Sequence, residues 1–360
     1  MRVTMSPTGS KGGFIEPLHA FRGVAIVNIV AVHAGSLAIY DFGGGTQDRG
    51  GLRLLAALNE VLFHSATLYF AFISGLLFSA VLSARGWQRF FANKLKYVLL
   101  PYVVMSTLFT ALHWHWSQHF DVFSGSPLAF VQTAGQHILA GTAMDPFWYI
   151  PVLACLFALT PAVHALLERK SLRWMVWLLV LAPLLVSRTG ADVSVANVIY
   201  FLGAYACGMA LGRDYAAASL WIEGHARWLA LAAILLSLAL LALIWTGYDR
   251  VGPVSVRETL FYLQKGALAG VFLTILSRWQ TIPPLLARLA DHAFAIYFLH
   301  LFALYTLAAG LRGLVGTPVP LYGVALVFGG LLAASLGVCL AVSAGFRAAL
   351  GKRARLLIGS

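Results

Sequence analysis

Residues 21–40 read FRGVAIVNIVAVHAGSLAIY, a run long and apolar enough to cross a bilayer as one helix. Two of its side chains, Arg22 and His33, do not suit that environment, because a group that carries or takes up a proton is costly in hydrocarbon. The stretch therefore predicts a transmembrane helix with two polar positions, and the rest of the chain must provide surroundings for both.

Helical geometry places Arg22 and His33 on nearly the same face of this helix. At about 100° per residue, eleven positions bring the two side chains within roughly 20° of each other. At about 1.5 Å per residue, they lie roughly 16 Å apart along the axis. We therefore expect Arg22 at one membrane edge and His33 deep on the same stripe, facing a polar cavity rather than lipid. The alternative is a structural histidine that hydrogen-bonds a neighbouring helix.

Composition indicates the class of protein. The chain has 360 residues, of which 60% are hydrophobic and 11% are charged, and its mean hydropathy is +0.82. Soluble domains carry about 25% charged residues, so these values indicate a polytopic membrane protein whose partner is the lipid bilayer. Basic residues gathered in cytoplasmic loops explain the net charge of +12, so we expect no nucleic-acid partner. The three cysteines fall inside apolar runs, at a spacing that suits neither a disulfide framework nor a metal site.

The apolar runs predict the fold class, an all-α polytopic membrane helix bundle of about ten transmembrane helices. We divide the chain into a cytoplasmic N-terminal segment (1–20), a single transmembrane domain (21–346) and a basic cytoplasmic tail (347–360). The predicted spans cover residues 21–40, 59–82, 95–113, 147–167, 173–188, 196–212, 227–246, 259–277, 291–311 and 320–346.

Basic residues give the expected orientation of the bundle. With the N-terminus in the cytoplasm, this topology places 18 Lys and Arg residues in cytoplasmic segments and 6 in outer segments. Lys265 lies within a span and completes the 25 basic residues of the chain. Because cytoplasmic loops of membrane proteins are enriched in Lys and Arg, this asymmetry predicts that both termini are cytoplasmic.

Two features of the second predicted span bear on packing and chemistry. Ser74 and Gly75 follow an aromatic run and are small enough for another helix backbone to approach closely. Glu60 and His64 lie one helical turn apart at the outer end of the span, as a candidate acid–base pair near an acceptor. The alternative for Glu60 and His64 is simple hydration at the membrane interface.

The segment before the third span contains Lys94 and Lys96. Cations attract phosphate, so these lysines are candidate contacts for a phosphorylated cytosolic ligand. Positive charge is also ordinary at a cytoplasmic membrane edge, and charge alone does not separate the two interpretations.

The fourth and ninth spans and the outer loop before the fourth span contain further candidate residues. Trp148 and Tyr149 open the fourth span, where they are either interfacial anchors or acceptor contacts. His300 lies well inside the ninth span and is a further acid–base candidate. We expect no metal site, because the histidine-rich loop before the fourth span offers one pair on a shared face and no evident third ligand. The residues of that loop are His113, Trp114, His115, Trp116, His119, Phe120 and His137.

Five segments, taken in order, resemble the motifs of the acyltransferase-3 family of integral membrane acyltransferases. The first is Arg22 followed, after ten residues, by His33. The others are Phe72-Ile73-Ser74-Gly75, the basic stretch that ends at Pro101-Tyr102, Phe147-Trp148-Tyr149-Ile150-Pro151 and Ala295-Ile296-Tyr297-Phe298-Leu299-His300. The resemblance extends from about residue 16 to residue 346. The chain departs from the family pattern at His19, where an acidic residue is common, and at Lys94 and Lys96, where paired arginines are common.

The resemblance implies transfer of an acyl group, often acetyl, from cytosolic acyl-CoA to a hydroxyl of an extracytoplasmic or lipid-linked glycan. It implies a location in the bacterial cytoplasmic (inner) membrane. Arg22 and His33 would be the functional pair, with Arg22, Lys94 and Lys96 at the donor. His33 would act as general base or as acyl carrier. The alternative of another class is a secondary transporter or flippase of a glycan or small solute that uses intramembrane histidines as proton relays.

Overall fold

The computed structural model describes residues 15–46, 50–112 and 127–359, and these ranges are almost entirely helical. The helices and strands are α1 Glu16–Leu37, η1 Ala38–Phe42, α2 Gly50–Phe63, α3 Thr67–Leu77, η2 Phe78–Leu82, η3 Ser83–Arg85, α4 Trp87–Lys94, η4 Leu95–Leu99, α5 Leu100–Ala111, α6 Pro127–Ala140, η5 Asp145–Trp148, α7 Tyr149–Glu168, α8 Met175–Leu181, η6 Ala182–Leu184, α9 Val195–Arg213, α10 Tyr215–Gly224, α11 Ala226–Thr246, β1 Arg250–Val251, β2 Val254–Ser255, α12 Val256–Ser277, α13 Pro284–Asp291, α14 Ala293–Arg312, α15 Leu321–Leu350, η7 Gly351–Arg353 and α16 Ala354–Leu357. The strands β1 and β2 form one short antiparallel hairpin.

Eight helical segments within the described ranges are long and apolar enough to cross a bilayer, and each overlaps a predicted span. The segment Gly50–Arg85 begins before the predicted span 59–82 and is interrupted between α2 and α3. The predicted all-α polytopic membrane bundle is therefore confirmed. The two other predicted spans, 95–113 and 173–188, differ from the structure. In the first, η4 and α5 form one continuous helix from Leu95 to Ala111 that is not among the eight segments, and in the second the apolar helix Met175–Leu184 has 10 residues. The second helix tightens and ends around Pro183, because proline has no N–H to donate to the preceding turn.

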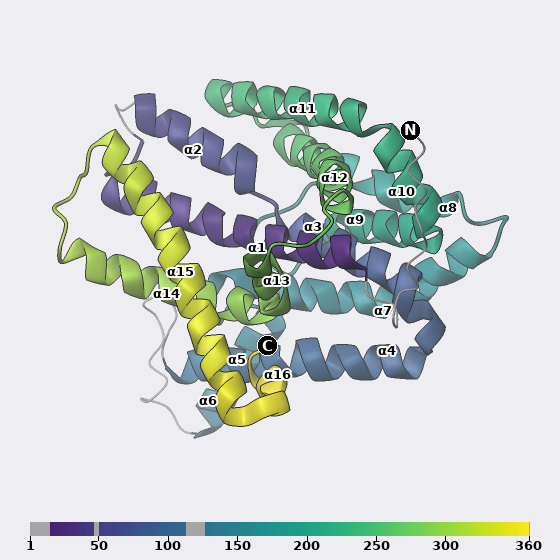
Figure 1. The fold of residues 1–360 in the computed structure, drawn as a ribbon, viewed down its shortest axis with the longest axis horizontal. Helices are drawn as coiled ribbons and strands as arrows, with labels where there is room; N and C mark the ends of the chain where they lie inside the picture. Colours follow the sequence, from purple (N-terminus) through teal and green to yellow (C-terminus); the bar gives the residue numbers. More distant parts are fainter. Residues whose placement is uncertain (1–14, 47–49, 113–126, 360) are drawn as a thin grey trace.

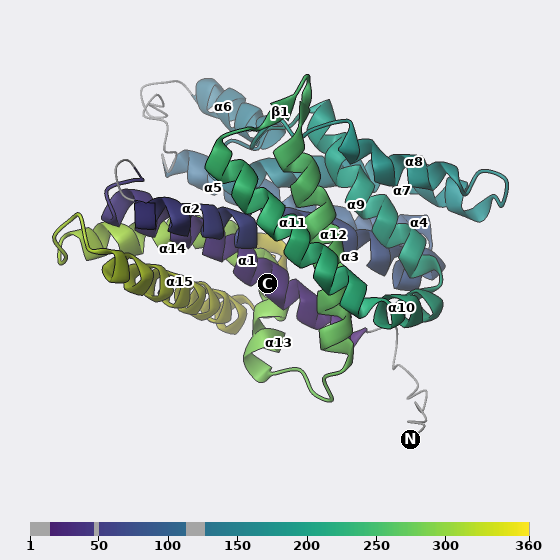
Figure 2. The ribbon, with the colours of Figure 1, turned by 90° about the horizontal axis from the view of Figure 1, so that it is seen from above.

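Helix α1 occupies the middle of the bundle (Figure 1). It packs against α2, α3, α12, α13, α14 and α15. Figure 2 shows α15 on one flank, and α4, α7, α8 and α9 on the opposite flank. Because α1 touches so many helices, most of its apolar side chains are buried; Phe21, Ile26 and Val30 are fully covered. The helix that carries Arg22 and His33 is thus an internal element with little exposure to lipid.

Helices α3 and α9 approach at backbone distance through glycines. A methyl group on Gly75 would collide with the carbonyl oxygen of Tyr205. A methyl group on Gly208 would collide with the carbonyl oxygen of Phe72. The close backbone approach predicted at Gly75 is confirmed, and it holds in place the α3 residues that line the cavity described below.

We predict that Gly208→Ala destabilises the bundle. The added methyl group has backbone on its far side and cannot be relieved by moving a side chain, and overpacking of this kind costs about 1–3 kcal/mol. The unfolding temperature of the purified protein in detergent should fall measurably.

Gly329→Ala is the matched control, because no atom lies within 4 Å of a methyl group at that position of α15. Equal unfolding temperatures for Gly208→Ala and Gly329→Ala would show that the α3–α9 contact does not limit stability.

Candidate active site

A large cavity with a basic lining opens between the start of α1, the end of α3, α4, α7, the start of α14 and the C-terminal segment. Its volume is about 700 Å³. Asp291 is the one carboxylate among its described lining residues, which include six basic side chains. Those six are Arg22, Arg85, Arg89, Lys94, Arg347 and Arg355. We call this space the basic cavity, and its excess of positive charge suits an anionic ligand.

Arg22 lines the basic cavity from the second turn of α1. Among the described residues, no carboxylate lies within ion-pair distance of its guanidinium. Asp291, the acidic residue of the cavity, instead pairs with His19 at 3.4 Å. A cation inside a helix bundle is costly without a counter-ion, so a bound anion would stabilise this arrangement.

Lys94 and Lys96 have different surroundings. Lys94 lines the basic cavity, and its ammonium group lies 4.2 Å from the centre of the Phe157 ring. Lys96 is exposed, lies outside the cavity lining and sits over Tyr97. Two positions on a helix differ by about 200° in direction, which separates the two lysines. Lys94 therefore lines a cavity that could hold an anion, whereas Lys96 does not, and the donor contact of either residue stays a prediction.

Burial and then the positive charge of Arg22 lower the pKa of Lys94 to about 8. Lys94 is therefore charged at neutral pH and loses its charge as the pH rises through 8. An anion in this cavity would oppose that loss, because it favours the charged ammonium group.

The C-terminal segment supplies two cations, Arg347 and Arg355, that the sequence did not place in the site. Helix α15 continues through the expected start of the tail to Leu350, and α16 then packs against α5. Ala354 and Ile358 are buried there, which fixes the segment. Arg355 lies 4.3 Å from the centre of the Tyr97 ring, and both residues line the basic cavity. The basic character of residues 347–360 is the only signal in the sequence, and it looks the same as ordinary cytoplasmic charge.

The inner end of the basic cavity is aromatic. The cavity follows α7 from Phe157 to Tyr149, a distance of about 12 Å at 1.5 Å per residue. Tyr149 and Tyr297 both line it and are both buried. The hydroxyl of Tyr297 donates to the carbonyl of Pro146, whereas the buried hydroxyl of Tyr149 has no hydrogen-bond partner among the described residues. A ligand that enters from the basic rim would meet these tyrosines last.

The interpretation of Trp148 and Tyr149 as interfacial anchors is wrong. Their exposed fractions are 6% and 3%, because α7 begins inside the bundle. Trp148 packs beneath the guanidinium of Arg188 at 5.1 Å and beside Phe201. Tyr149 lines the basic cavity.

A second, smaller cavity of about 170 Å³ contains His33. We call it the His33 cavity. Its lining combines hydroxyl, carboxylate and apolar side chains, namely His33, Ser36, Leu37, Tyr40, Asp41, Leu301 and Tyr305. Asp41 also forms an ion pair with Arg312, which joins η1 to the end of α14. The basic cavity does not include His33, so the stripe that joins Arg22 to His33 on α1 borders two separate spaces.

His300 lies beside His33. The centres of the two rings are 5.3 Å apart, and His300 is fully buried in α14. Tyr297, one turn earlier on the same helix, lines the inner end of the basic cavity. His33 makes no hydrogen bond with any described residue, so the alternative of a histidine that bonds a neighbouring helix gains no support.

Glu60 and His64 do not pair with each other. The backbone N–H of His64 still donates to the carbonyl of Glu60, and the chain turns directly afterwards, where Ser65 adopts a φ of 59°. Glu60 pairs with Arg257 at 3.4 Å, and His64 lies 3.8 Å from the carboxylate of Glu258.

The acidic partner of His64, Glu258, was not identified from the sequence. It is 8% exposed, and one of its carboxylate oxygens has no hydrogen-bond partner among the described residues. Its position at the start of α12, remote in sequence from α2, left no local signal.

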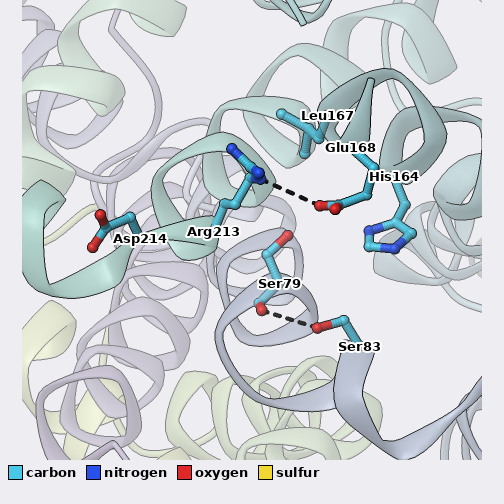
Figure 3. A pocket seen from close by; sticks show the side chains of 7 residues that line it. All are labelled: Ser79, Ser83, His164, Leu167, Glu168, Arg213 and Asp214. Carbon is cyan, nitrogen blue, oxygen red and sulfur yellow. Dashed lines mark hydrogen bonds and ion pairs between the residues drawn. The ribbon is translucent and has the colours of Figure 1, made fainter. Parts of the chain in front are cut away.

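A third cavity, the side pocket, lies next to the basic cavity and has a volume of about 400 Å³ (Figure 3). Here the guanidinium of Arg213 pairs with Glu168 at 3.2 Å, so its charge is already balanced. Asp214 caps α10 by accepting from the backbone of Ala217. His164, at the edge of the side pocket, packs against Phe78, which packs in turn against Phe90 of the basic cavity. This aromatic cluster separates the two spaces, and of these two the basic cavity has the excess of cations among its described lining residues.

The expectations for the histidine-rich loop fall mainly on residues that the structure does not describe. His113, His115 and His119 lie outside the described ranges, as do the tryptophans between them. His137 lies in α6 and shares a hydrogen bond of 2.7 Å with the hydroxyl of Thr142.

These features define a class of protein: a polytopic membrane protein with a deep cationic cavity at one end and a histidine-containing cavity toward the other. The model of the acyltransferase-3 family, described as an acyltransferase domain, matches residues 16–344. The chain belongs to this family and is a membrane acyltransferase. Comparisons with curated proteins and with solved structures return no match.

We predict that Lys94→Ala weakens binding of coenzyme A, whose phosphate groups make it a suitable anionic probe. Loss of a hydrogen bond to a charged group costs about 1.5–3 kcal/mol, or roughly 10- to 150-fold in Kd. Wild-type affinity should also fall as the pH rises through 8, because Lys94 becomes neutral, and Lys94→Arg should remove that fall. Titration of the detergent-purified protein at pH 7 and pH 9 measures both effects.

Lys96→Ala provides the control, since Lys96 is exposed and lies outside the cavity lining. If both alanine variants bound coenzyme A with equal affinity, the placement of Lys94 in an anion site would be contradicted.

Proposed function

We propose that this acyltransferase moves an acyl group, in the simplest case acetyl, from cytosolic acyl-CoA to a hydroxyl of an extracytoplasmic or lipid-linked glycan. It would act in the cytoplasmic membrane of a bacterium. The observation that carries this proposal is the relation of the cavities. The basic cavity ends at Tyr297, one helical turn from His300, and the ring of His300 lies 5.3 Å from that of His33.

The basic cavity matches the chemistry of an acyl-CoA donor. The nucleotide of the donor carries several phosphates and cannot enter lipid, so it requires cations at an aqueous opening. Arginine holds phosphate through paired N–H donors, and five arginines line this cavity. The inner part, with Phe70, Ile73 and Leu153, is apolar and suits the uncharged arm that carries the thioester.

The His33 cavity matches the chemistry of a polyhydroxylated acceptor. Carboxylate and hydroxyl groups of Ser36, Asp41 and Tyr305 can exchange hydrogen bonds with sugar hydroxyls. Aromatic rings such as Tyr40 provide faces on which a sugar ring can lie. We therefore place the donor and the acceptor in different cavities, with the acyl group passing between α1 and α14.

His33 would provide the base that a sugar hydroxyl needs, since a hydroxyl is a poor nucleophile while protonated. Neutral His33 takes the hydroxyl proton as the oxygen attacks the carbonyl carbon of the thioester. The new C–O bond forms, the C–S bond breaks, and the proton on His33 passes to the departing thiolate. If His33 instead carried the acyl group, its nitrogen would attack the thioester first and the hydroxyl would attack the acyl-imidazole in a second step.

We predict that His33→Gln lowers acyl transfer at least 100-fold while coenzyme A binding stays within about twofold. Glutamine keeps hydrogen-bonding groups but cannot act as a base near neutral pH, and general-base catalysis contributes about 10²- to 10⁴-fold. The assay follows label from radioactive acetyl-CoA into extracted glycan, using membranes that contain the variant.

Substantial transfer by a well-expressed His33→Gln protein would refute the role of His33. Absence of label in glycan with the wild-type protein would instead refute the acyl-CoA donor or the glycan acceptor. A labelled His33 recovered by rapid acid quenching would indicate the acyl-carrier route rather than the general-base route.

The proposed orientation places the basic cavity in contact with the cytosol and makes a prediction of its own. Ser171 and Gly316 are both exposed, in the α7–α8 and α14–α15 connections respectively. In intact cells, an impermeant thiol reagent should label Gly316→Cys but not Ser171→Cys, because the positive-inside distribution assigns the α7–α8 connection to the cytoplasm. The reverse pattern would overturn the orientation.

A further inference from the structure

The ring of His300 is in a defined chemical state. Its Nδ1 atom lies 2.9 Å from the carbonyl oxygen of Tyr297 and 3.1 Å from that of Ile296. A carbonyl oxygen only accepts, so Nδ1 must carry the hydrogen and donate it. In the neutral ring, Nε2 is then an acceptor with a free lone pair.

That Nε2 atom is buried and has no hydrogen-bond partner among the described residues. A buried acceptor without a partner is costly, and such groups in folded proteins call for an explanation. Two contacts hold His300 in place. Its ring donates to the backbone through Nδ1, and its own carbonyl accepts a hydrogen bond from Ser335 of α15. The structure thus fixes an acceptor in the interior without providing its donor.

His33 is the neighbouring group able to supply that donor. Its ring centre is 5.3 Å from that of His300, and no hydrogen bond to a described residue fixes which of its nitrogens carries the hydrogen. We propose that His300 is a positioning residue: its Nε2 accepts the N–H of His33 during the reaction and leaves the other nitrogen of His33 as the base. The proposal rests on the acyl transfer proposed above and adds the partner that orients its base.

This partnership explains how His33 could serve as a base although, among the described residues, no carboxylate lies within ion-pair distance of its ring. A base works best when a third group fixes its tautomer and direction. As His33 takes the hydroxyl proton it becomes an imidazolium, and an acceptor on its other N–H stabilises that charge. When the proton moves on to the departing thiolate, both rings return to their neutral states, so His300 gains and loses no atoms.

The test compares His300→Phe with His300→Gln. Phenylalanine keeps an aromatic ring but offers no acceptor, whereas the side-chain oxygen of glutamine can accept near the position of Nε2. We expect His300→Phe to lower kcat about 10- to 100-fold, by analogy with the loss seen when the partner that orients a metal-ligating histidine is removed. The KM for acetyl-CoA should stay within about twofold, and His300→Gln should recover most of the lost kcat. Rates are measured with acetyl-CoA and native membranes.

Two controls separate orientation from packing. Ser335→Ala removes a hydrogen bond to the backbone of His300 and leaves its ring intact, so kcat should change little. If His300→Phe does not fold, His300→Leu replaces it in the same comparison with glutamine. Equal rates for the glutamine and apolar variants, or equal loss in kcat and in acetyl-CoA affinity, would overturn the positioning role. That result would leave the proposed function intact, because the proposed function depends on His33→Gln.

Discussion

A polar or ionisable side chain inside a membrane needs polar surroundings, and helix α1 carries two such side chains. Arg22 and His33 lie on one stripe of an otherwise apolar helix, so each requires a space that lipid does not fill. The bundle meets the requirement by surrounding α1 with other helices and leaving a cavity at each position. The two cavities are therefore a direct consequence of placing these residues on a buried span.

Counter-ions distinguish the spaces at the Arg22 end of the bundle. In the side pocket, Arg213 already has Glu168 as its partner, so the ion pair is complete without a ligand. In the basic cavity the cations outnumber the single described carboxylate, and that carboxylate pairs with His19. Binding of an anion is favourable in the second case because Arg22 is removed from water without an ion-pair partner among the described residues.

Much of the fold could be predicted from the sequence, because the length of an apolar run and its glycine positions are local properties. Eight spans and the close approach at Gly75 belong to this kind of information. The residues of the candidate site could be predicted only in part. Arg22 and His33 stand out against their apolar surroundings. Lys94 and Lys96 look alike in the sequence, and only the packing of their helix shows which of the two faces the cavity. The contributions of Arg355 and Glu258 depend on packing between remote segments, which no local pattern reports.

The position of α1 also has a consequence for assembly. This helix comes early in the chain, yet it packs against α12, α13, α14 and α15, which are made more than two hundred residues later. Contacts so distant in sequence form late, since many intervening residues must first be ordered. It follows that Arg22 and His33 lack their cavities during most of insertion, and that α1 reaches its stable position in the membrane only when the last third of the bundle closes around it.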